Sequence, residues 1–378
     1  MDLNELREQL NTIDDEILKL FLKRMEISGL VAESKRQSGK AVFDAQRENA
    51  IIERLTKNLS ATEAEAVTEL YKMIFTISRK KQHRLLRKES ALTQTLRAHF
   101  DAPSLLPDSA DVACQGTEGA YSSMACRKLF SNPSTLYFEN FESVFKSVQC
   151  GLSQFGILPF ENSIYGSVVE VYEKLCHTDV YVVKAVKLPI HHALLVKKGT
   201  NLSDIREIYS HPQAIGQCGQ FLNTQKNVRV TKCLNTALAA RMVAESDRTD
   251  IAAIASETCA ENYGLTILKK DIQNSSTNFT YFYCICRDLM ILPDANKAAF
   301  MFNVANEKGS LADVLTKFSL KNINLTKIES QPIPGRDFEF MFYAEADIAG
   351  KIDEMLSLFT ELEEELSFFR FIGIYSEI

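Results

Sequence analysis

Residues 44–55 read DAQRENAIIERL, and this stretch decides how the N-terminal part of the chain folds. Its isoleucines and Leu55 recur at helical spacing, so a helix with one apolar stripe is predicted to begin here. Arg47 falls on the same row, four residues before the first isoleucine, and Asp44 and Glu48 form the neighbouring row. A core-facing stripe that carries an arginine beside two carboxylates indicates that this face contacts something other than apolar side chains.

The segment before this helix predicts one long amphipathic helix of about 30 residues. It ends at a glycine-containing break, residues 38–40. Its apolar residues repeat every seven positions along two rows, and Arg24 occupies a core position of one row, with Arg7 and Lys35 at the flanks. A lone helix of this length cannot bury its stripe, so we expect partner helices, and a second subunit would supply them.

A third predicted helix has the same unusual polarity. One of its i, i+4 rows is apolar at Leu70 and Ile74 and then polar at Ser78 and Gln82. Charged side chains on such faces can reach water or pair with one another. Burying so many polar groups together is costly unless each one is matched, which favours a small polyanion bound inside a helical bundle.

The composition is that of an ordinary globular protein with a net charge of −6, which gives a nucleic-acid partner no bulk electrostatic support. No apolar run reaches the length of a membrane span, and the acidic, amphipathic N-terminus does not resemble a signal peptide. Nine cysteines occur without CxxC pairs, which is typical of reduced thiols. We therefore expect a cytoplasmic protein with no nucleic-acid and no membrane partner.

The chain also lacks the motifs of several cofactor chemistries. Its six histidines show no HExxH or other metal-ligand spacing, so no metal is expected. There is no GxGxxG after a strand and no GxxxxGK[ST], so neither dinucleotide nor ATP chemistry is expected. Cys284 and Cys286, two apart on a predicted strand, are interpreted as packing residues. No cofactor is predicted.

The chain divides into segments of different texture. Residues 1–88 are almost purely helical in pattern, and residues 89–109, with two prolines, are interpreted as a linker. Residues 110–288 alternate short β-rich runs with helical patterns, the signature of an α/β domain. Residues 296–378 follow the order β-α-β-β-α-β, the ferredoxin-like plan. The fold class is therefore multidomain, all-α followed by α/β.

Small polar residues are concentrated at four strand-to-helix junctions of the α/β segment. The junctions read GTEGAYS (116–122), PFENSIYGSV (159–168), SHPQAIGQC (210–218) and CLNTALAA (233–240). Free N–H groups at helix N-termini bind anions, although Ser, Thr and Asn at any one junction also serve as ordinary helix caps. Four such junctions, together with the strand that carries Thr280, favour a shared cleft.

The helical segment resembles the all-helical chorismate mutases through LxxLR (3–7), LKR (22–24), Lys35, DxxRE (44–48) and Ser78-x-x-x-Gln82. The mutase reaction is intramolecular, so it needs a held conformer and stabilised charge on the ether oxygen. The resemblance implies three roles: carboxylate clamps at Arg7 (from the partner subunit), Arg24, Arg47 and Ser78; ether-oxygen donors at Lys35 and Gln82; and hydroxyl partners at Asp44 and Glu48.

The α/β segment resembles prephenate dehydratase, since GxxGxYS, ENSxxGxV, SHPQAxxQC, ASExCAExYGLxIL and NxT-x-F occur in that family's order. The implied fold is two α/β lobes around a cleft, similar to periplasmic binding proteins. A group beside the leaving hydroxyl must donate a hydrogen bond or a proton. The resemblance implies that this group is Thr280, and it places four further residues in the same cleft: Glu161, Asn162, Ser210 and Gln217. His211 is either a proton source or a structural histidine.

One position departs from the dehydratase pattern, because the family reads Thr-Arg-Phe where this chain has Tyr281 in the middle. Side chains alternate along a strand, so a regular strand would turn Thr280 and Phe282 to one face and Phe279 and Tyr281 to the other. The missing arginine would then be supportive rather than catalytic. A β-bulge would break this argument.

The C-terminal segment resembles an ACT domain, a small module that senses amino acids. The resemblance implies that phenylalanine binds between paired domains, at residues from two stretches: Gly309, Ser310 and Leu311, and Glu329, Ser330 and Gln331. Gln331 stands where an arginine is usual, and the two side chains differ in charge and reach. The alternative is a purely structural dimerisation module.

Together these resemblances imply a bifunctional chorismate mutase/prephenate dehydratase, with chorismate and prephenate as substrates and phenylalanine as effector. The long first helix and the ACT pairing predict a homodimer or a higher homo-oligomer. One alternative is a mutase fused to an arogenate dehydratase. A dehydrogenase partner would need a nicotinamide fingerprint, which is missing. A non-enzymatic phenylalanine-binding regulator would be expected to have lost its polar cleft residues, and these remain.

Overall fold

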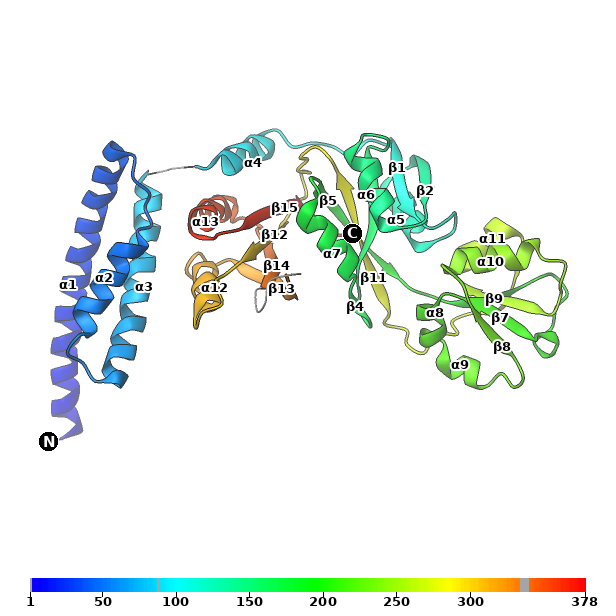
Figure 1. Cartoon of the computed structure of the whole chain (residues 1–378), viewed down its shortest axis with the longest axis horizontal. Coiled ribbons are helices and arrows are strands. Elements are labelled where there is room, and N and C mark those ends of the chain that lie inside the picture. Colours follow the sequence, from blue (N-terminus) through cyan, green and yellow to red (C-terminus); the bar gives the residue numbers. More distant parts are fainter. Residues whose placement is uncertain (1, 87–88, 334–339) are drawn as a thin grey trace. The chain divides into compact units, whose positions relative to one another are not determined.

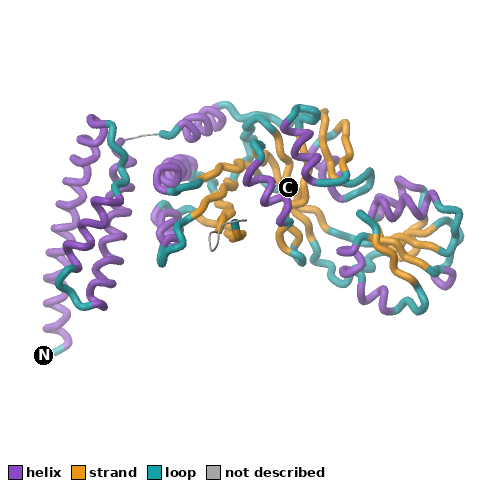
Figure 2. The backbone as a smooth tube through the Cα atoms, viewed as in Figure 1, coloured by secondary structure: helices purple, strands orange, loops and turns teal. Residues whose placement is uncertain are grey.

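The computed structural model describes residues 2–86, 89–333 and 340–378. The chain divides into two compact units: one comprises Met1–Ala98 and Phe302–Phe369, and the other comprises His99–Met301 and Arg370–Ile378. Figure 1 shows the elements in chain order, and Figure 2 shows how helices and strands alternate along the backbone. The predicted N-terminal boundary at residue 88 lies outside the described residues, and the four domain boundaries stay predictions.

The N-terminal segment is an antiparallel helical bundle, as predicted. Its helices are α1 (Leu3–Ser38), α2 (Ala45–Thr56) and α3 (Ala61–Leu86). The predicted break falls at Gly39, which adopts a left-handed φ of 68° that favours glycine and ends α1. Asp44 caps α2 because its carboxylate accepts from the backbone N–H of Arg47 at 3.0 Å.

The region predicted as a linker contains a further helix, α4 (Ala91–Asp101). Thr93 and Leu96, three residues apart, are fully buried on one of its faces. The two prolines of this region, Pro103 and Pro107, follow the helix, so its backbone hydrogen bonds are intact. The proline content alone therefore did not reveal the helix.

The α/β segment forms two lobes within one unit. The first lobe is a sheet in the order β5-β11-β3-β1-β2, in which β11 runs antiparallel to both of its neighbours. Its elements are β1 (Ser109–Gln115), α5 (Tyr121–Leu129), β2 (Asn132–Phe138), α6 (Phe141–Gln149), β3 (Phe155–Asn162), β4 (Gly166–Ser167), α7 (Val169–His177), β5 (Tyr181–Pro189) and β11 (Phe279–Cys286).

The second lobe is a five-stranded sheet in the order β10-β6-β9-β7-β8. Its elements are β6 (Ala193–Val196), η1 (Leu202–Asp204), β7 (Glu207–Ser210), α8 (Pro212–Gln217), α9 (Gly219–Asn223), β8 (Arg229–Lys232), α10 (Thr236–Glu245), β9 (Ile251–Ala255), α11 (Glu257–Tyr263) and β10 (Thr266–Lys269). The chain passes between the lobes twice, from β5 to β6 and from β10 to β11 (Figure 1).

Each lobe has its own apolar core. In the first, Val112, Ile157 and Phe282 belong to one buried cluster that joins β1, β3 and β11. In the second, alanines of α10 pack on β9, whose five residues are all buried. A strand buried on both faces is typical of a sheet covered by helices on each side, so each lobe is a layered structure with an apolar core.

The C-terminal segment has the predicted βαββαβ order: β12 (Lys297–Asn303), α12 (Ser310–Leu320), β13 (Asn324–Pro332), β14 (Phe340–Asp347), α13 (Ile352–Glu365) and β15 (Phe369–Tyr375). At the end of β15, Gly373 lies opposite Val182 of β5, and both belong to the second unit. A Cβ at Gly373 would lie 2.1 Å from the carbonyl oxygen of Val182, so only glycine fits there.

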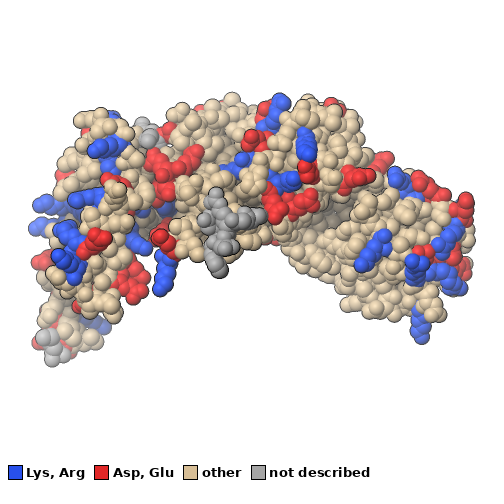
Figure 3. Space-filling view, viewed as in Figure 1, with Lys and Arg blue, Asp and Glu red and all other residues tan. Residues whose placement is uncertain are grey.

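Two general properties of the described residues bear on function. None of the helices in the described ranges is long and apolar enough to cross a membrane. Across those same residues, no cluster of His, Cys, Asp and Glu is suited to hold a metal ion. On the face that Figure 3 displays, acidic and basic side chains are interspersed, so neither sign dominates that face.

Candidate functional sites

The centre of the helical bundle brings two of the predicted mutase residues into direct contact. Arg24 of α1 donates from Nη1 to the Ser78 hydroxyl of α3 at 2.5 Å, and its guanidinium lies over the Phe75 ring. Burial lowers the pKa of the Arg24 guanidinium. A partly desolvated cation with a neutral hydrogen-bond partner is well suited to receive a carboxylate.

Gln82 lies one helical turn after Ser78 and is also buried. Its amide nitrogen donates to the Ser28 hydroxyl of α1 at 3.1 Å. Its Oε1 is buried without a hydrogen-bond partner among the described residues. A buried amide oxygen without a partner is unfavourable, so packing within the bundle does not explain why residue 82 is a glutamine.

The other predicted mutase residues are placed around the same bundle. Lys35 donates to the backbone carbonyl of Val42 at 2.5 Å and is partly buried. The side chains of Asp44 and Arg47 are exposed at the start of α2. Arg7 is exposed as well, 17 residues before Arg24 on one straight helix, which at 1.5 Å per residue separates them by about 25 Å. One chain therefore does not bring Arg7 to Arg24.

Two bundle residues were missed from the sequence. Arg79 is buried and donates from Nη1 to both carboxylate oxygens of Glu48, at 2.5 and 2.6 Å. Ser28 is the hydrogen-bond partner of Gln82. Neither residue breaks an apolar repeat, and their pairing depends on how the helices are rotated about their axes.

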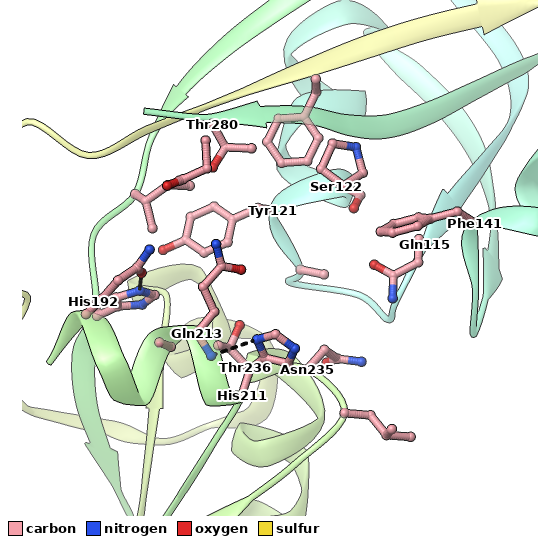
Figure 4. Close-up of a pocket in the computed structure, with 18 residues that line it drawn as sticks. Gln115, Tyr121, Ser122, Phe141, His192, His211, Gln213, Asn235, Thr236 and Thr280 are labelled. Atoms are coloured by element: carbon pink, nitrogen blue, oxygen red, sulfur yellow. Dashed lines mark hydrogen bonds between the residues drawn. The ribbon is translucent and has the colours of Figure 1, made fainter. Parts of the chain in front are cut away.

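A cavity of about 210 Å³ lies in the α/β segment. All four junctions singled out in the sequence contribute to its lining, through Tyr121 and Ser122, Asn162, Gln217, and Asn235 and Thr236, and Thr280 also lines it. In Figure 4, Thr280 and Thr236 lie on opposite sides of the cavity, with His192 and Gln115 at its two ends. The prediction of a shared cleft is confirmed.

Thr280 is held by a directed hydrogen-bond chain. The Asn162 side-chain oxygen accepts from the backbone N–H groups of Ile164 and Tyr165, each at 3.0 Å, which turns its Nδ2 toward β11. That nitrogen donates to Thr280 Oγ1 at 2.9 Å and to the Asn278 side-chain oxygen at 2.8 Å. Because Thr280 accepts from Asn162, its own hydroxyl hydrogen is left to donate elsewhere.

His211 lines the cavity from the start of α8, where it is the N-cap residue. Its Nδ1 accepts from the backbone N–H of Gln213 at 3.3 Å (Figure 4). Burial lowers the pKa of the His211 imidazole. A neutral ring with Nδ1 as acceptor carries its proton on Nε2, so His211 has a structural duty in addition to any role toward a ligand.

Two predicted dehydratase residues do not line the cavity. Ser210 is fully buried, and its hydroxyl donates to the Ile254 carbonyl at 2.7 Å, which ties β7 to β9. Glu161 lies opposite Tyr281 in the register of β3 and β11. Glu161 and Asn162 are neighbours on β3, so their side chains point to opposite faces of the sheet. Asn162 faces the cavity, and Glu161 faces away from it.

The strand that carries Thr280 alternates as predicted. Thr280 and Phe282 line the cavity, whereas Phe279 and Tyr281 lie against Lys187, whose Nζ is 4.6 and 5.3 Å from their ring centroids. The register with β3 does shift between Tyr281 and Phe282, but the extra residue belongs to β3. The bulge therefore leaves the alternation of β11 intact, and Tyr281 points away from the cavity.

The predicted phenylalanine-binding residues lie on two elements of the C-terminal segment. Gly309 precedes α12 with a left-handed φ of 89°, and Ser310 and Leu311 form the first turn of that helix. Glu329, Ser330 and Gln331 belong to β13, where Gln331 donates to the Glu329 carboxylate at 3.0 Å. A binding site between paired domains would need a second copy of these elements.

His192 was also missed from the sequence. It lines the cavity, it is 2% exposed, and its Nε2 lies 2.7 Å from the Gln217 side-chain oxygen. It stands next to a second histidine between two predicted strands, and no periodic pattern distinguishes one from the other.

Comparisons with known proteins agree with this division into sites. The family model for chorismate mutase type II matches residues 6–83, and that for prephenate dehydratase matches residues 112–289. The chain is 30% identical over 378 residues to the bifunctional chorismate mutase/prephenate dehydratase of Escherichia coli (strain K12), covering 98% of this chain and 95% of the relative.

Two further relatives each match about 70% of the chain. The chloroplastic arogenate dehydratase/prephenate dehydratase 2 of Arabidopsis thaliana is 37% identical over 276 residues, 70% of this chain and 72% of the relative. The solved prephenate dehydratase of Arthrobacter aurescens in complex with L-Phe has a TM-score of 0.63 and 23% identity, covering 70% of this chain and 90% of that chain. At this identity the likeness shows the fold alone.

The helical bundle, the two-lobed α/β segment with its polar cavity and the ferredoxin-like C-terminus define a multidomain enzyme that acts on small aromatic-ring precursors. The chain belongs to the bifunctional chorismate mutase/prephenate dehydratase family. It is an enzyme of phenylalanine biosynthesis that rearranges chorismate to prephenate and converts prephenate to phenylpyruvate. The predicted family, fold class and enzyme class are thereby confirmed.

Proposed function

We propose that the helical bundle performs the mutase step around Arg24, Ser78 and Gln82. The observation that supports this is the partly desolvated Arg24 guanidinium, whose hydrogen bond goes to a neutral hydroxyl. There it binds a carboxylate of chorismate, with Ser78 at its side. Lys35 and Gln82 donate to the ether oxygen as its bond breaks, and Arg47, Asp44 and Glu48 bind the remaining polar groups from α2.

A rotation of the Gln82 amide fits this role. The Ser28 hydroxyl donates to the Ser78 carbonyl at a long 3.5 Å. Turning the Gln82 amide by half a rotation lets Ser28 donate to Oε1 in place of that bond. Both ends of Gln82 are then used, because its nitrogen is free to donate to the ether oxygen. The buried Oε1 that has no partner among the described residues supports this assignment.

We further propose that the mutase is a homodimer joined through α1. Leu10, Ile13 and Ile17 on its heptad rows are 57%, 51% and 59% exposed in the single chain. A stripe of this kind is stable when a second amphipathic helix covers it. Pairing also supplies Arg7 from the partner subunit to the site that holds Arg24, which one chain does not do. Charge on the substrate then meets arginines from both subunits.

For the dehydratase step we assign to Thr280 the hydrogen bond to the leaving hydroxyl. The bond from prephenate's ring to its carboxylate breaks to release CO2, and the electrons move through the ring. The C–O bond opposite then breaks, and the leaving hydroxide takes up a proton from solvent to become water. The Asn162 hydrogen bond supports this role, because it leaves the Thr280 hydroxyl hydrogen for the leaving oxygen. Gln217 contributes a polar contact in the same cavity, and Glu161 and Ser210 support the strands from outside it.

The prephenate dianion meets neutral donors in this cavity. Among the described residues that line it, none is Lys, Arg, Asp or Glu. The N-termini of α5 and α10 open onto it through Tyr121 and Thr236, and such ends carry free N–H groups and partial positive charge. We assign the two carboxylates of prephenate to these helix ends.

Arogenate is the second candidate substrate. The relative from Arabidopsis thaliana carries arogenate dehydratase in its name and is 37% identical over 276 residues. The two substrates differ in an amino or a keto group on the side chain. Incubating the purified chain with each one separately and identifying the product as phenylpyruvate or phenylalanine decides between them. Prephenate turned over faster supports our assignment, and arogenate turned over faster contradicts it.

Phenylalanine is our proposed effector, at Gly309–Leu311 and Glu329–Gln331 of paired C-terminal domains. Feedback requires phenylalanine to bind one state of the dehydratase better than another. The L-Phe complex of a protein with this fold supports the proposal. Calorimetry at millimolar phenylalanine tests it: a binding isotherm is expected, and the absence of heat would leave the module a dimerisation domain.

We also propose that the enzyme is cytoplasmic. All nine cysteines are free, and most of them are buried within the two α/β lobes. Unpaired buried thiols are typical of reducing compartments. Separation of soluble and membrane fractions from cells, followed by assay of both activities, tests the location.

A further inference from the structure

His192 lies where the two passages between the lobes run side by side. Its backbone N–H donates to the Gln273 side-chain oxygen at 2.9 Å, and its carbonyl accepts from the Ile272 N–H at 3.0 Å. His192 itself precedes β6, whereas Ile272 and Gln273 belong to the return passage before β11. The backbone of this histidine is therefore fixed from both sides, which sets the direction of its ring.

Among the described residues, the ring of His192 has one hydrogen-bond partner, and that partner determines where its proton resides. Nε2 lies 2.7 Å from the side-chain oxygen of Gln217, and the ring meets the edge of Tyr121 at a centroid distance of 6.2 Å. With the Gln217 oxygen facing Nε2, as it does in this structure, Nε2 carries the proton, because an amide oxygen can only accept. Nδ1 has no partner among the described residues, and burial lowers the pKa of the ring, so His192 is neutral.

The consequence falls on Gln217. A glutamine amide facing a cavity can present either its oxygen or its nitrogen, since the two ends differ by a half rotation. His192 occupies the oxygen, and the main chain of Gln217 is held separately by the Asn274 N–H at 2.6 Å. The nitrogen, with its two donor hydrogens, is the end that remains for a ligand in the cavity.

We propose that His192 is a positioning residue of the dehydratase: it holds the Gln217 amide so that its nitrogen donates to a carboxylate or keto oxygen of the substrate. The inference rests on the proposed place of Gln217 in the dehydratase site. It matters most in this cavity because no cationic side chain is among its described lining residues. An amide oxygen turned inward would repel a substrate with two carboxylates, whereas the nitrogen attracts it.

The test measures steady-state dehydratase kinetics of the full chain with prephenate. His192→Phe keeps the ring size and removes the donor, and His192→Gln restores a donor at the position of Nε2. We expect kcat/KM to fall about tenfold in the phenylalanine variant, mainly through KM, and to recover largely in the glutamine variant. Equal losses in both variants would overturn the proposal.

A double-mutant cycle separates positioning from mere packing. Gln217→Leu removes the amide, so adding His192→Phe to it is expected to cost nothing further. Additive losses would mean that His192 acts independently of Gln217 and would contradict the proposal. If Gln217→Leu alone keeps the wild-type kcat/KM, Gln217 is not part of the site and the proposed function of this residue is wrong. If Gln217→Leu lowers kcat/KM but His192→Phe does not, only the positioning role of His192 is contradicted.

A substitution with a charge tests the direction of the amide. In Gln217→Glu, one carboxylate oxygen keeps the His192 hydrogen bond and the other faces the substrate, so the KM for prephenate is expected to rise above that of Gln217→Leu. Equal KM values in Gln217→Glu and Gln217→Leu would contradict the proposal. Because neither variant changes His192, this comparison tests the direction of the amide even if His192→Phe does not fold. His191→Phe is the matched control, since the exposed His191 bonds to Asp271 and does not line the cavity, and mutase turnover in each preparation reports folding.

Discussion

At the scale of single residues, Thr280 illustrates how a weak acid becomes useful. Its hydroxyl is not acidic by itself, but Asn162 occupies one of its lone pairs and leaves the hydrogen directed away from that bond. Asn162 in turn cannot rotate, because two backbone N–H groups hold its oxygen. These contacts therefore orient the Thr280 hydroxyl as a hydrogen-bond donor and do not make it a general acid.

Thr280→Val tests this donor most simply. The substitution keeps the shape of the side chain and removes the hydroxyl, so dehydratase kcat with prephenate is expected to fall by about 10²-fold or more. Thr280→Ser keeps the hydroxyl and is expected to retain most of the activity. Kinetics on purified prephenate measure both, and a valine variant as active as the serine variant would contradict the role.

Arg24→Leu is the matching test in the helical bundle. Removing the guanidinium eliminates a charged hydrogen-bond donor at the substrate, so mutase kcat/KM is expected to fall by about 10²- to 10³-fold. Dehydratase turnover of added prephenate is expected to stay at the wild-type level, which controls for folding of the remaining chain. Undiminished conversion of chorismate would remove Arg24 from the site.

At the scale of secondary-structure elements, α8 depends on a histidine cap. Burial lowers the pKa of His211 below the ordinary value of about 6.5, so the ring stays neutral and Nδ1 accepts from Gln213 through that pH. Protonation adds a hydrogen to Nδ1 and breaks the cap. The dehydratase rate is therefore expected to hold from pH 8 to 6.5 and to fall only at lower pH.

His211→Asn separates this effect from other titrations. Asparagine is a good N-cap residue that does not titrate, so the part of the acid limb caused by His211 is expected to disappear. His211→Leu has no cap acceptor at any pH, so the start of α8 is destabilised by about 1 kcal/mol and the rate is expected to be lower throughout the pH range. The pH profiles of kcat/KM measure all three, and an unchanged acid limb in the asparagine variant would exclude His211 as its source.

Elements were more predictable from the sequence than the contacts between them. The break at Gly39, the helix beginning after Asp44 and the alternation of β11 all follow from local rules, and each is observed. The ion pair of Glu48 with Arg79 and the bond of His192 to Gln217 join residues distant in the sequence. Such pairs depend on helix rotation and on lobe packing, which no local pattern encodes.

Within the candidate dehydratase site, the limits of prediction are equally physical. Thr280, Asn162 and Gln217 were predicted and line one cavity. Ser210 lies in the same junction as Gln217, but its short side chain turns into the sheet and bonds to Ile254. The motif identified the junction correctly, whereas the direction of each side chain required the three-dimensional structure.

At the scale of the whole molecule, the exposed stripe of α1 predicts a dimer whose loss affects one activity more than the other. Leu10→Glu places a charge in the centre of that stripe, so dimerisation through α1 is expected to weaken and mutase activity to fall with it. Analytical ultracentrifugation and mutase assays at several protein concentrations measure this. Glu16→Gln on the same helix, outside the two heptad rows, is the control. A dimer with full mutase activity in Leu10→Glu would contradict pairing through α1.

The central claim is that one chain carries two chemically separate sites, one around Arg24 and one around Thr280. The most direct measurement is a chromatographic time course of products from chorismate, for the wild type and for Thr280→Val. The wild type is expected to form phenylpyruvate by way of prephenate. The variant is expected to convert chorismate at the wild-type rate and to accumulate prephenate. Phenylpyruvate formed by Thr280→Val at the wild-type rate would contradict the assignment of the second site.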